Sequence, residues 1–148
     1  MVKVKKLDLV FLIETKLRSN KMVEIKLKAG LKNIFVVDCE GRSGGLALLW
    51  GAEVDLKIVN YSRRHIHTKI TSHELGTLWK FTDFYRHPVP HKRHEVWSLM
   101  HHLKSMGLLP WVCVGDFNEI LDLSEKVGGS GRSNQLMEAF IETLNFVN

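Results

Sequence analysis

The fold is decided by the stretch Trp111-Val112-Cys113-Val114-Gly115-Asp116-Phe117-Asn118. Its first four residues are apolar and suit a buried β-strand, and the strand exit presents Asp116 and Asn118 two positions apart. If the backbone stays extended past Gly115, the two side chains point the same way and offer a carboxylate and an amide to one point. An Asx turn is the alternative, and it is favoured when this stretch is considered alone.

A second strand exit also delivers a carboxylate. Residues 7–13 are Leu-Asp-Leu-Val-Phe-Leu-Ile, a nearly continuous apolar run typical of a strand buried on both faces, and Glu14 follows it. Ligands of layered sheet proteins gather where several strands end together, so we expect Glu14 and Asp116 to converge. The alternative is that Glu14 is a solvated loop residue or a charge at the start of a helix.

Four segments carry more extended motifs, and they are, in order, Phe11-Leu12-Ile13-Glu14-Thr15-Lys16, Gly41-Arg42-Ser43-Gly44-Gly45-Leu46-Ala47-Leu48-Leu49-Trp50, Phe81-Thr82-Asp83-Phe84-Tyr85-Arg86-His87-Pro88 and Gly115-Asp116-Phe117-Asn118-Glu119-Ile120. Their order and separations resemble the endonuclease/exonuclease/phosphatase superfamily, whose fold is deoxyribonuclease I-like. Within it the chain resembles the apurinic-type endonuclease domain of plant LINE retrotransposons. The downstream Glu-Lys-Val-Gly-Gly at residues 125–129 is also similar to the plant form, so the resemblance covers essentially the whole chain.

This resemblance implies an α/β (α+β) fold, a two-layer β-sandwich flanked by helices, in one partial domain over residues 1–148. The family opens with a strand that ends in Asn and closes with a Ser-Asp-His motif, and this sequence contains neither. We therefore expect an incomplete domain, truncated at both ends. Its exposed sheet edges are expected to self-associate.

The resemblance also implies a metal-dependent site. Glu14 matches a ligand of Mg²⁺ or Mn²⁺, and such a hard cation takes one or two carboxylates and completes its shell with water and phosphate. Asp116 matches the residue that orients or deprotonates the attacking water. Asn118 matches an amide donor to the phosphate, and Tyr85 a phenol that helps to hold the developing charge.

Basic residues point to a polyanion as partner. The chain has 21 Lys and Arg against 16 Asp and Glu, a net charge of +5 and a pI near 9.3. One basic group is Arg63, Arg64 and His65, for which solvated surface is the alternative. Arg86 stands where relatives commonly have Gly. Contacts with phosphate or nucleic acid are expected of Lys16, Arg86, Lys92 and Arg93.

The expected function is metal-dependent phosphodiester hydrolysis by a DNA-nicking endonuclease of a LINE-type retroelement, here as an inactive or incomplete fragment. The alternatives are a non-catalytic nucleic-acid-binding remnant and a phosphatase that acts on a small phosphate ester. The plant retroelement motifs count against the phosphatase. A zinc site at His87, His91 and His94 is disfavoured, because their surroundings are basic and no Cys or carboxylate completes a tetrahedral set.

Composition indicates a globular protein without a membrane span. Hydrophobic residues make up 45% and charged residues 25% of the chain, and no apolar run reaches about 18 residues. The start, Met-Val-Lys-Val-Lys-Lys, lacks the apolar region of a signal peptide, and Cys39 and Cys113 lie in apolar surroundings that favour buried reduced thiols. We expect an intracellular protein, nuclear or cytoplasmic, with DNA as partner and no membrane association.

Hydrophobic periodicity predicts a strand, a helix, several strands and then helix, strand and helix. Ser19 and Asn20 are expected to cap a helix over residues 21–28. The glycine-rich residues 41–45 lack the Gly-Lys-Ser/Thr of a phosphate-binding loop and precede a strand, which favours a turn between strands. Further strands are predicted over residues 33–38, 46–50, 54–61, 66–71 and 78–85, and further helices over residues 91–106 and 134–144.

Overall fold

The structure is a computed structural model that describes residues 7–41, 43–85, 89, 92–117, 119–125, 127–128 and 133–147. The chain divides into two compact units. Unit 1 comprises residues 1–85 and 109–115, and unit 2 comprises residues 86–108 and 116–148. The expectation of one partial domain stays a prediction.

The first sheet of unit 1 has three strands, β1 (Leu9–Ile13), β2 (Asn33–Val37) and β3 (Leu46–Trp50). The central strand β3 pairs antiparallel with both neighbours, in the order β1-β3-β2. Its first four side chains are fully buried, which explains why its sequence is apolar without alternation. A turn closed by reciprocal hydrogen bonds between Glu40 and Ser43 joins β2 to β3, and it confirms the turn predicted for the glycine-rich segment.

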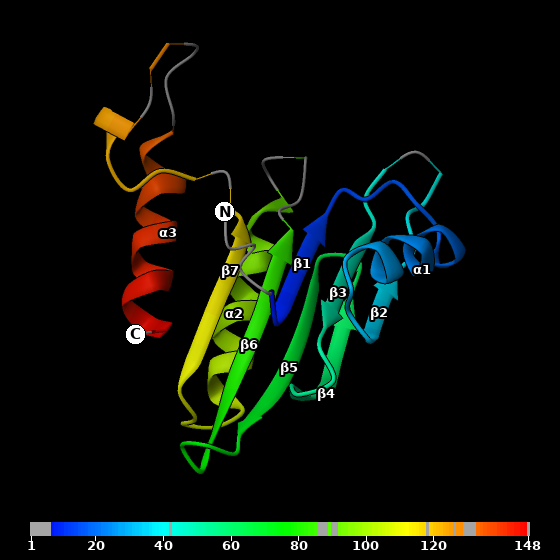
Figure 1. Ribbon diagram of the computed structural model, residues 1–148. Helices are drawn as coiled ribbons and strands as arrows, with labels where there is room; N and C mark the ends of the chain where they lie inside the picture. The colour runs from blue at the N-terminus through cyan, green and yellow to red at the C-terminus, as the bar shows by residue number, and fades with distance from the viewer. Residues whose placement is uncertain are drawn as a thin grey trace, which may run out of the picture. The chain divides into compact units, whose positions relative to one another are not determined.

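The second sheet of unit 1 has the strand order β4-β5-β6-β7, with β4 (Asp55–Ser62), β5 (His65–Ser72), β6 (Thr77–Tyr85) and β7 (Trp111–Asp116). Strands β4, β5 and β6 form an antiparallel meander. The Lys80 N–H donates to the Pro110 carbonyl near the start of both β6 and β7, and Gly115 lies against Phe84 near their ends. These two strands are therefore parallel, as the arrows in Figure 1 show, and they end at the same edge of the sheet.

The two sheets pack face to face around one hydrophobic core. Leu46 and Leu48 of β3 meet Ile66, Ile70 and Phe81 of the second sheet, and each of these side chains is buried. The alternation of buried apolar residues along β5 and β6 directs one face of that sheet toward the core. The predicted two-layer sandwich is confirmed, and the observed strand bounds differ from the predicted ones by at most a few residues.

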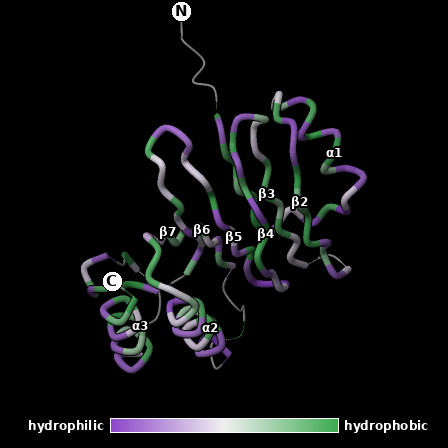
Figure 2. Tube along the Cα trace, turned by 90° about the horizontal axis from the view of Figure 1, so that it is seen from below, coloured by the Kyte–Doolittle hydropathy of each residue, from purple (hydrophilic) through white to green (hydrophobic). Residues whose placement is uncertain are grey.

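Helix α1 (Ser19–Lys28) covers the outer face of the first sheet, as Figure 2 shows. Its buried Met22 packs against Ala47 and Leu49, which alternate with the core residues of β3. The prediction that Ser19 and Asn20 cap the helix from outside is wrong, because the helix already begins at Ser19. The carboxylate of Asp38, at the end of β2, instead accepts hydrogen bonds from the Ser19 N–H at 2.8 Å and from its hydroxyl at 2.7 Å.

The described part of unit 2 is helical and contains α2 (His94–Ser105) and α3 (Asn134–Val147), with the short 3₁₀ helix η2 (Leu123–Glu125) between them in sequence. Figure 2 shows α2 and α3 side by side. The Trp97 ring of α2 stacks on Phe140 of α3 with centroids 5.0 Å apart, and Phe117 joins them. Val96, Met100 and Leu103 of α2 are also buried, whereas Met106 at the end of the helix is exposed. None of the helices in the described part of the chain is long and apolar enough to cross a membrane.

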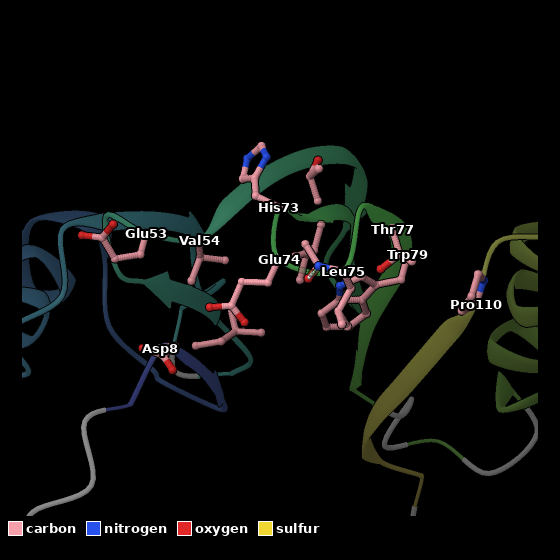
Figure 3. Close-up of a pocket in the computed structure, with 13 residues that line it drawn as sticks. Asp8, Glu53, Val54, His73, Glu74, Leu75, Thr77, Trp79 and Pro110 are labelled. Carbon is pink, nitrogen blue, oxygen red and sulfur yellow. Dashed lines mark hydrogen bonds between the residues drawn. The ribbon is translucent and has the colours of Figure 1, made fainter.

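One end of the sandwich holds an apolar cavity of about 670 Å³ (Figure 3). Leu9 of β1, Ile70 of β5 and Trp79 of β6 line it, so it opens between the two sheets. Strand β1 is also an edge strand, paired within the described residues with β3 alone. An open edge beside uncovered apolar surface favours association, and the expected self-association stays a prediction.

Asp83 is a buried carboxyl group of the sandwich. Its place between Phe81 and Tyr85 on β6 puts it on the core face, where it is 0% exposed. Its Oδ1 accepts the Ile66 N–H at 2.7 Å, and its Oδ2 has no partner among the described residues. Desolvation raises the pKa of Asp83 to about 8, although the hydrogen bond from Ile66 opposes this shift.

We predict that the free energy of unfolding decreases between pH about 4 and pH about 8 because of Asp83. The folded state retains a proton that the unfolded state releases, so stability from this group is present at low pH and is lost as pH rises toward the folded pKa. Asp83→Asn should remove a slope of up to about 1.4 kcal/mol per pH unit, measured by urea unfolding across this range.

The parent's free energy of unfolding also depends on buried His65 and His67, whose pKa values burial lowers to about 4, and their contribution has a pH slope of opposite sign. Subtracting the pH profile of Asp83→Asn from that of the parent removes the histidine contribution and leaves that of Asp83. Asp122→Asn is the matched control, since hydrogen bonds from Ser124 lower the pKa of that exposed carboxyl and it titrates below the range. Parallel pH profiles of the parent and Asp83→Asn would contradict the assignment.

Candidate active site

The exit of β1 is a strained loop that presents Glu14. Glu14 and Lys16 have φ angles of 50° and 52°, in the left-handed region that L-residues seldom adopt. The loop is held there by the segment before β3, because the Thr15 N–H donates to the Gly45 carbonyl at 3.2 Å and the Lys16 N–H to the Gly44 carbonyl at 3.0 Å. A Cβ atom on Gly45 would lie 2.3 Å from the Thr15 hydroxyl, so the close approach requires glycine.

Tyr85 ends β6 and points to the same loop. Its side chain is buried on the core face, and its hydroxyl donates a hydrogen bond to Oε1 of Glu14. We call these two residues the Glu14–Tyr85 pair. The residues are far apart in sequence, and the packing of the two sheets brings them together. The structure thus unites two of the residues that the sequence predicted for the site.

Arg64 lies beside this pair, and the sequence named it only in the basic group with Arg63 and His65, without assigning it to the site. It lies in the turn between β4 and β5, and its guanidinium carbon is 5.2 Å from the centroid of the Tyr85 ring. Its carbonyl also accepts the Tyr85 N–H at 2.7 Å. The sequence signal was the Arg63-Arg64 doublet before a strand, which does not reveal which arginine faces the site.

Asp116 is the last residue of β7 and is half-buried. It belongs to unit 2, whereas the Glu14–Tyr85 pair lies in unit 1, so the expected convergence of Glu14 with Asp116 stays a prediction. The residue before it, Gly115, lies against Phe84, and Phe84 directly precedes Tyr85. A Cβ atom on Gly115 would lie 2.0 Å from the Phe84 carbonyl oxygen, so this approach of β7 to β6 also requires glycine.

The residues that were expected to contact phosphate differ in how exposed their side chains are. Lys16 and Lys92 are exposed. Arg93 is 4% exposed, and its guanidinium pairs with Glu119 at 2.5 Å within unit 2. A buried ion pair of this kind counts against a phosphate contact, because separating the pair would leave a buried charge uncompensated. The other two predicted residues, Asn118 and Arg86, lie outside the described residues, as do His87 and His91 of the disfavoured zinc set.

Glu14 is the one residue that the sequence analysis predicted to bind a metal ion, and it lies within the described residues. They contain no cluster of three or more His, Cys, Asp or Glu side chains that could hold a metal ion. Glu14 is exposed, and its Oε1 accepts the hydrogen bond from the Tyr85 hydroxyl. One carboxylate open to solvent suits Mg²⁺ or Mn²⁺, which retain water ligands, and does not suit a closed zinc site.

The close approach at Gly115 gives a prediction. Gly115→Ala should destabilise the chain by roughly 2–4 kcal/mol, because the new methyl group collides with the backbone of Phe84. Gly107→Ala is the matched control, since Gly107 also has a positive φ, of 136°, but has nothing within 4 Å of an added Cβ. Urea unfolding of both variants checks this, and equal losses of stability would show that conformation alone, and not the contact with β6, requires Gly115.

The expectation that Cys39 and Cys113 are buried is wrong, because both side chains are half-buried, and they form no disulfide with each other.

Comparisons with known proteins establish the fold. No protein-family model and no curated protein sequence matches the chain. Among solved structures, the chain is similar to the AP endonuclease LMAP from Leishmania major, with a TM-score of 0.71, 13% identity and coverage of 97% of this chain and 58% of that one. It is also similar to an AP endonuclease from Archaeoglobus fulgidus, with a TM-score of 0.67, 17% identity and coverage of 95% and 60%.

A third similar structure is the 3′ phosphatase NExo from Neisseria bound to a product DNA hairpin, with a TM-score of 0.63, 16% identity and coverage of 94% and 60%. The chain thus spans about three fifths of the length of these structures. The shared architecture is the deoxyribonuclease I-like fold, and this confirms the fold class predicted from the sequence.

Proposed function

We propose that this chain carries part of the active site of a metal-dependent phosphodiesterase that acts on DNA. The observation that carries the proposal is the hydrogen bond from the Tyr85 hydroxyl to Glu14, which joins the ends of two strands from different sheets. The similar structures support it, since two are named as AP endonucleases and the third holds a product DNA hairpin. The net charge of +5 also favours a polyanion as substrate.

Each residue of the proposed site has a defined task. Glu14 would hold Mg²⁺ or Mn²⁺ through its carboxylate, and a bound ion of this kind neutralises charge on a phosphate oxygen. Tyr85 fixes the orientation of Glu14 by donating to one of its oxygens. Its phenol is also a hydrogen-bond donor for charge that develops on the phosphate.

Asp116 and Asn118 are the other two residues proposed for catalysis, and both belong to the motif of residues 115–118. An ionised Asp116 would accept the proton of the attacking water, and Asn118 would donate from its amide to a phosphate oxygen. Both assignments rest on the resemblance of the motif Gly115-Asp116-Phe117-Asn118. Lys16 and Lys92, both exposed, are proposed to attract the DNA backbone.

The biological setting that we propose is a LINE-type retroelement of a plant, in which the endonuclease nicks DNA inside the cell, in the nucleus or cytoplasm. The four motifs and the Glu-Lys-Val-Gly-Gly segment support this origin.

Metal binding at the proposed site can be tested by thermal melting. Millimolar Mg²⁺ or Mn²⁺ should raise the Tm of the parent by about 2–4 °C, which is about 1 kcal/mol for a chain of this size. The increase should shrink in Glu14→Gln and in Asp116→Asn. Glu53→Gln, which removes an exposed carboxylate at the apolar cavity, should keep the full increase. The same metal response in all four proteins would argue against a shared site.

Catalysis is tested separately. We expect the 148-residue chain to leave supercoiled plasmid intact in the presence of Mg²⁺ or Mn²⁺, because residues that act as one catalytic unit fail together and the family's Ser-Asp-His motif is not in this sequence. Agarose gel electrophoresis measures the conversion to nicked circles. Metal-dependent nicking that disappears in Glu14→Ala would refute the expectation of inactivity and establish the chain as an enzyme.

A further inference from the structure

We propose that the apolar cavity between the two sheets of unit 1 is a binding site for a small hydrophobic cation, an organic amine with an aromatic or aliphatic body. The cavity has a volume of about 670 Å³, and its lining combines apolar side chains from both sheets with exposed carboxylates. The proposal concerns a second site and does not depend on the proposed function.

The cavity lies at the other end of the sandwich from the Glu14–Tyr85 pair. Leu9, which lines the cavity, is the first residue of β1, and Glu14 follows the last. Trp79 lines it near the start of β6 and precedes Tyr85 by about 20 Å of extended strand. The described lining residues all belong to unit 1, so the cavity is a feature of one compact unit.

The interior of the cavity suits an apolar body. Ile70 is buried, and Leu9, Val54 and Trp79 are half-buried. The volume of about 670 Å³ lies within the range of about 300–1,000 Å³ that is usual for small-molecule sites. Binding would transfer the hydrocarbon surface of a ligand from water into these apolar surroundings, which is the main favourable contribution to its affinity.

The charged residues around the cavity are acidic. Asp8, Glu53 and Glu74 line it and are exposed, and none of the described lining residues is Lys or Arg. His73 also lines the cavity, and its Nε2 lies 3.2 Å from a carboxylate oxygen of Asp55. This local excess of negative charge contrasts with the net charge of +5 of the whole chain. The charge at the cavity therefore favours a positively charged ligand over a neutral or negative one.

Trp79 adds an aromatic ring to the same cavity. Its ring meets Phe81 edge-on with centroids 6.3 Å apart, so the indole packs against the core of the sandwich. An indole attracts a cation more strongly than the other aromatic side chains do. In the view of Figure 3, Asp8 and Glu53 lie on one side of the cavity, Trp79 lies on the other, and Glu74 lies between them. Carboxylates and an indole thus surround the space that an amine would occupy.

Binding of naphthalene derivatives of matched shape tests this proposal. The probes are naphthylmethylammonium, naphthylmethanol and naphthylacetate, which are positive, neutral and negative at neutral pH. Isothermal titration calorimetry, without DNA or divalent metal, gives their Kd values. The parent should bind the cation about tenfold more tightly than the anion, with the neutral compound in between. A higher salt concentration should narrow this difference, because exposed charges are screened.

Variants of the lining residues locate the site. Glu74→Gln and Asp8→Asn should each weaken binding of the cation about threefold and leave that of the neutral compound unchanged. Glu24→Gln is the matched control, since it removes an exposed carboxylate of α1 that is not among the described lining residues. Val54→Phe should fill part of the cavity and weaken binding of all the probes. Thermal melts check that each variant is folded.

The other outcomes overturn the proposal in different ways. Failure of every probe to bind, or loss of affinity in Glu24→Gln that equals the loss in Glu74→Gln, would refute the site. Equal affinity for the three probes would refute the selection of a cation. Sedimentation equilibrium tests for a different occupant: if the parent self-associates and Val54→Phe is monomeric, a second copy of the chain covers the cavity in place of an amine.

Discussion

The hydrogen bond between Tyr85 and Glu14 depends on how the two sheets of unit 1 are stacked. Tyr85 ends a strand of one sheet and Glu14 follows a strand of the other, so the bond forms only when the core between the sheets fixes their separation. Leu46 and Leu48 of β3 and Ile66 of β5 fill that space without any exposure to solvent. Close packing of this kind resists displacement, and it therefore also determines the geometry of the site.

Glycine sets the second constraint on the site. Gly45 lets the loop after β1 approach the segment before β3, and Gly115 lets β7 approach β6. In both places a backbone atom or side chain occupies the space that a Cβ atom would need. Each of the two predicted carboxylates, Glu14 and Asp116, is thus next to a close approach that only glycine permits.

Local sequence patterns were sufficient to predict most of the fold. Alternation and apolar runs predicted the seven strands and the three α-helices of the described residues, because each pattern reflects which face of its own element is buried. Glu14 and Tyr85 were predicted through motifs, and the structure brings them together. Contacts between distant elements left no such pattern. Asp38 as the cap of α1, the Arg93–Glu119 ion pair and the position of Arg64 over Tyr85 all depend on packing that no single segment encodes.

The parallel pairing of β6 with β7 also constrains how the chain is assembled. Residues 109–115 belong to unit 1, but they are synthesised only after residues 86–108 of unit 2. The second sheet therefore cannot add β7 until residues 86–108, which connect β6 to β7, have been synthesised. Bringing the two ends of this long connection together costs conformational entropy before the hydrogen bond from the Lys80 N–H to the Pro110 carbonyl forms. Division of the gene after residue 85 would remove β7 from its own sheet, so the two units are not separable modules for expression or for evolutionary exchange.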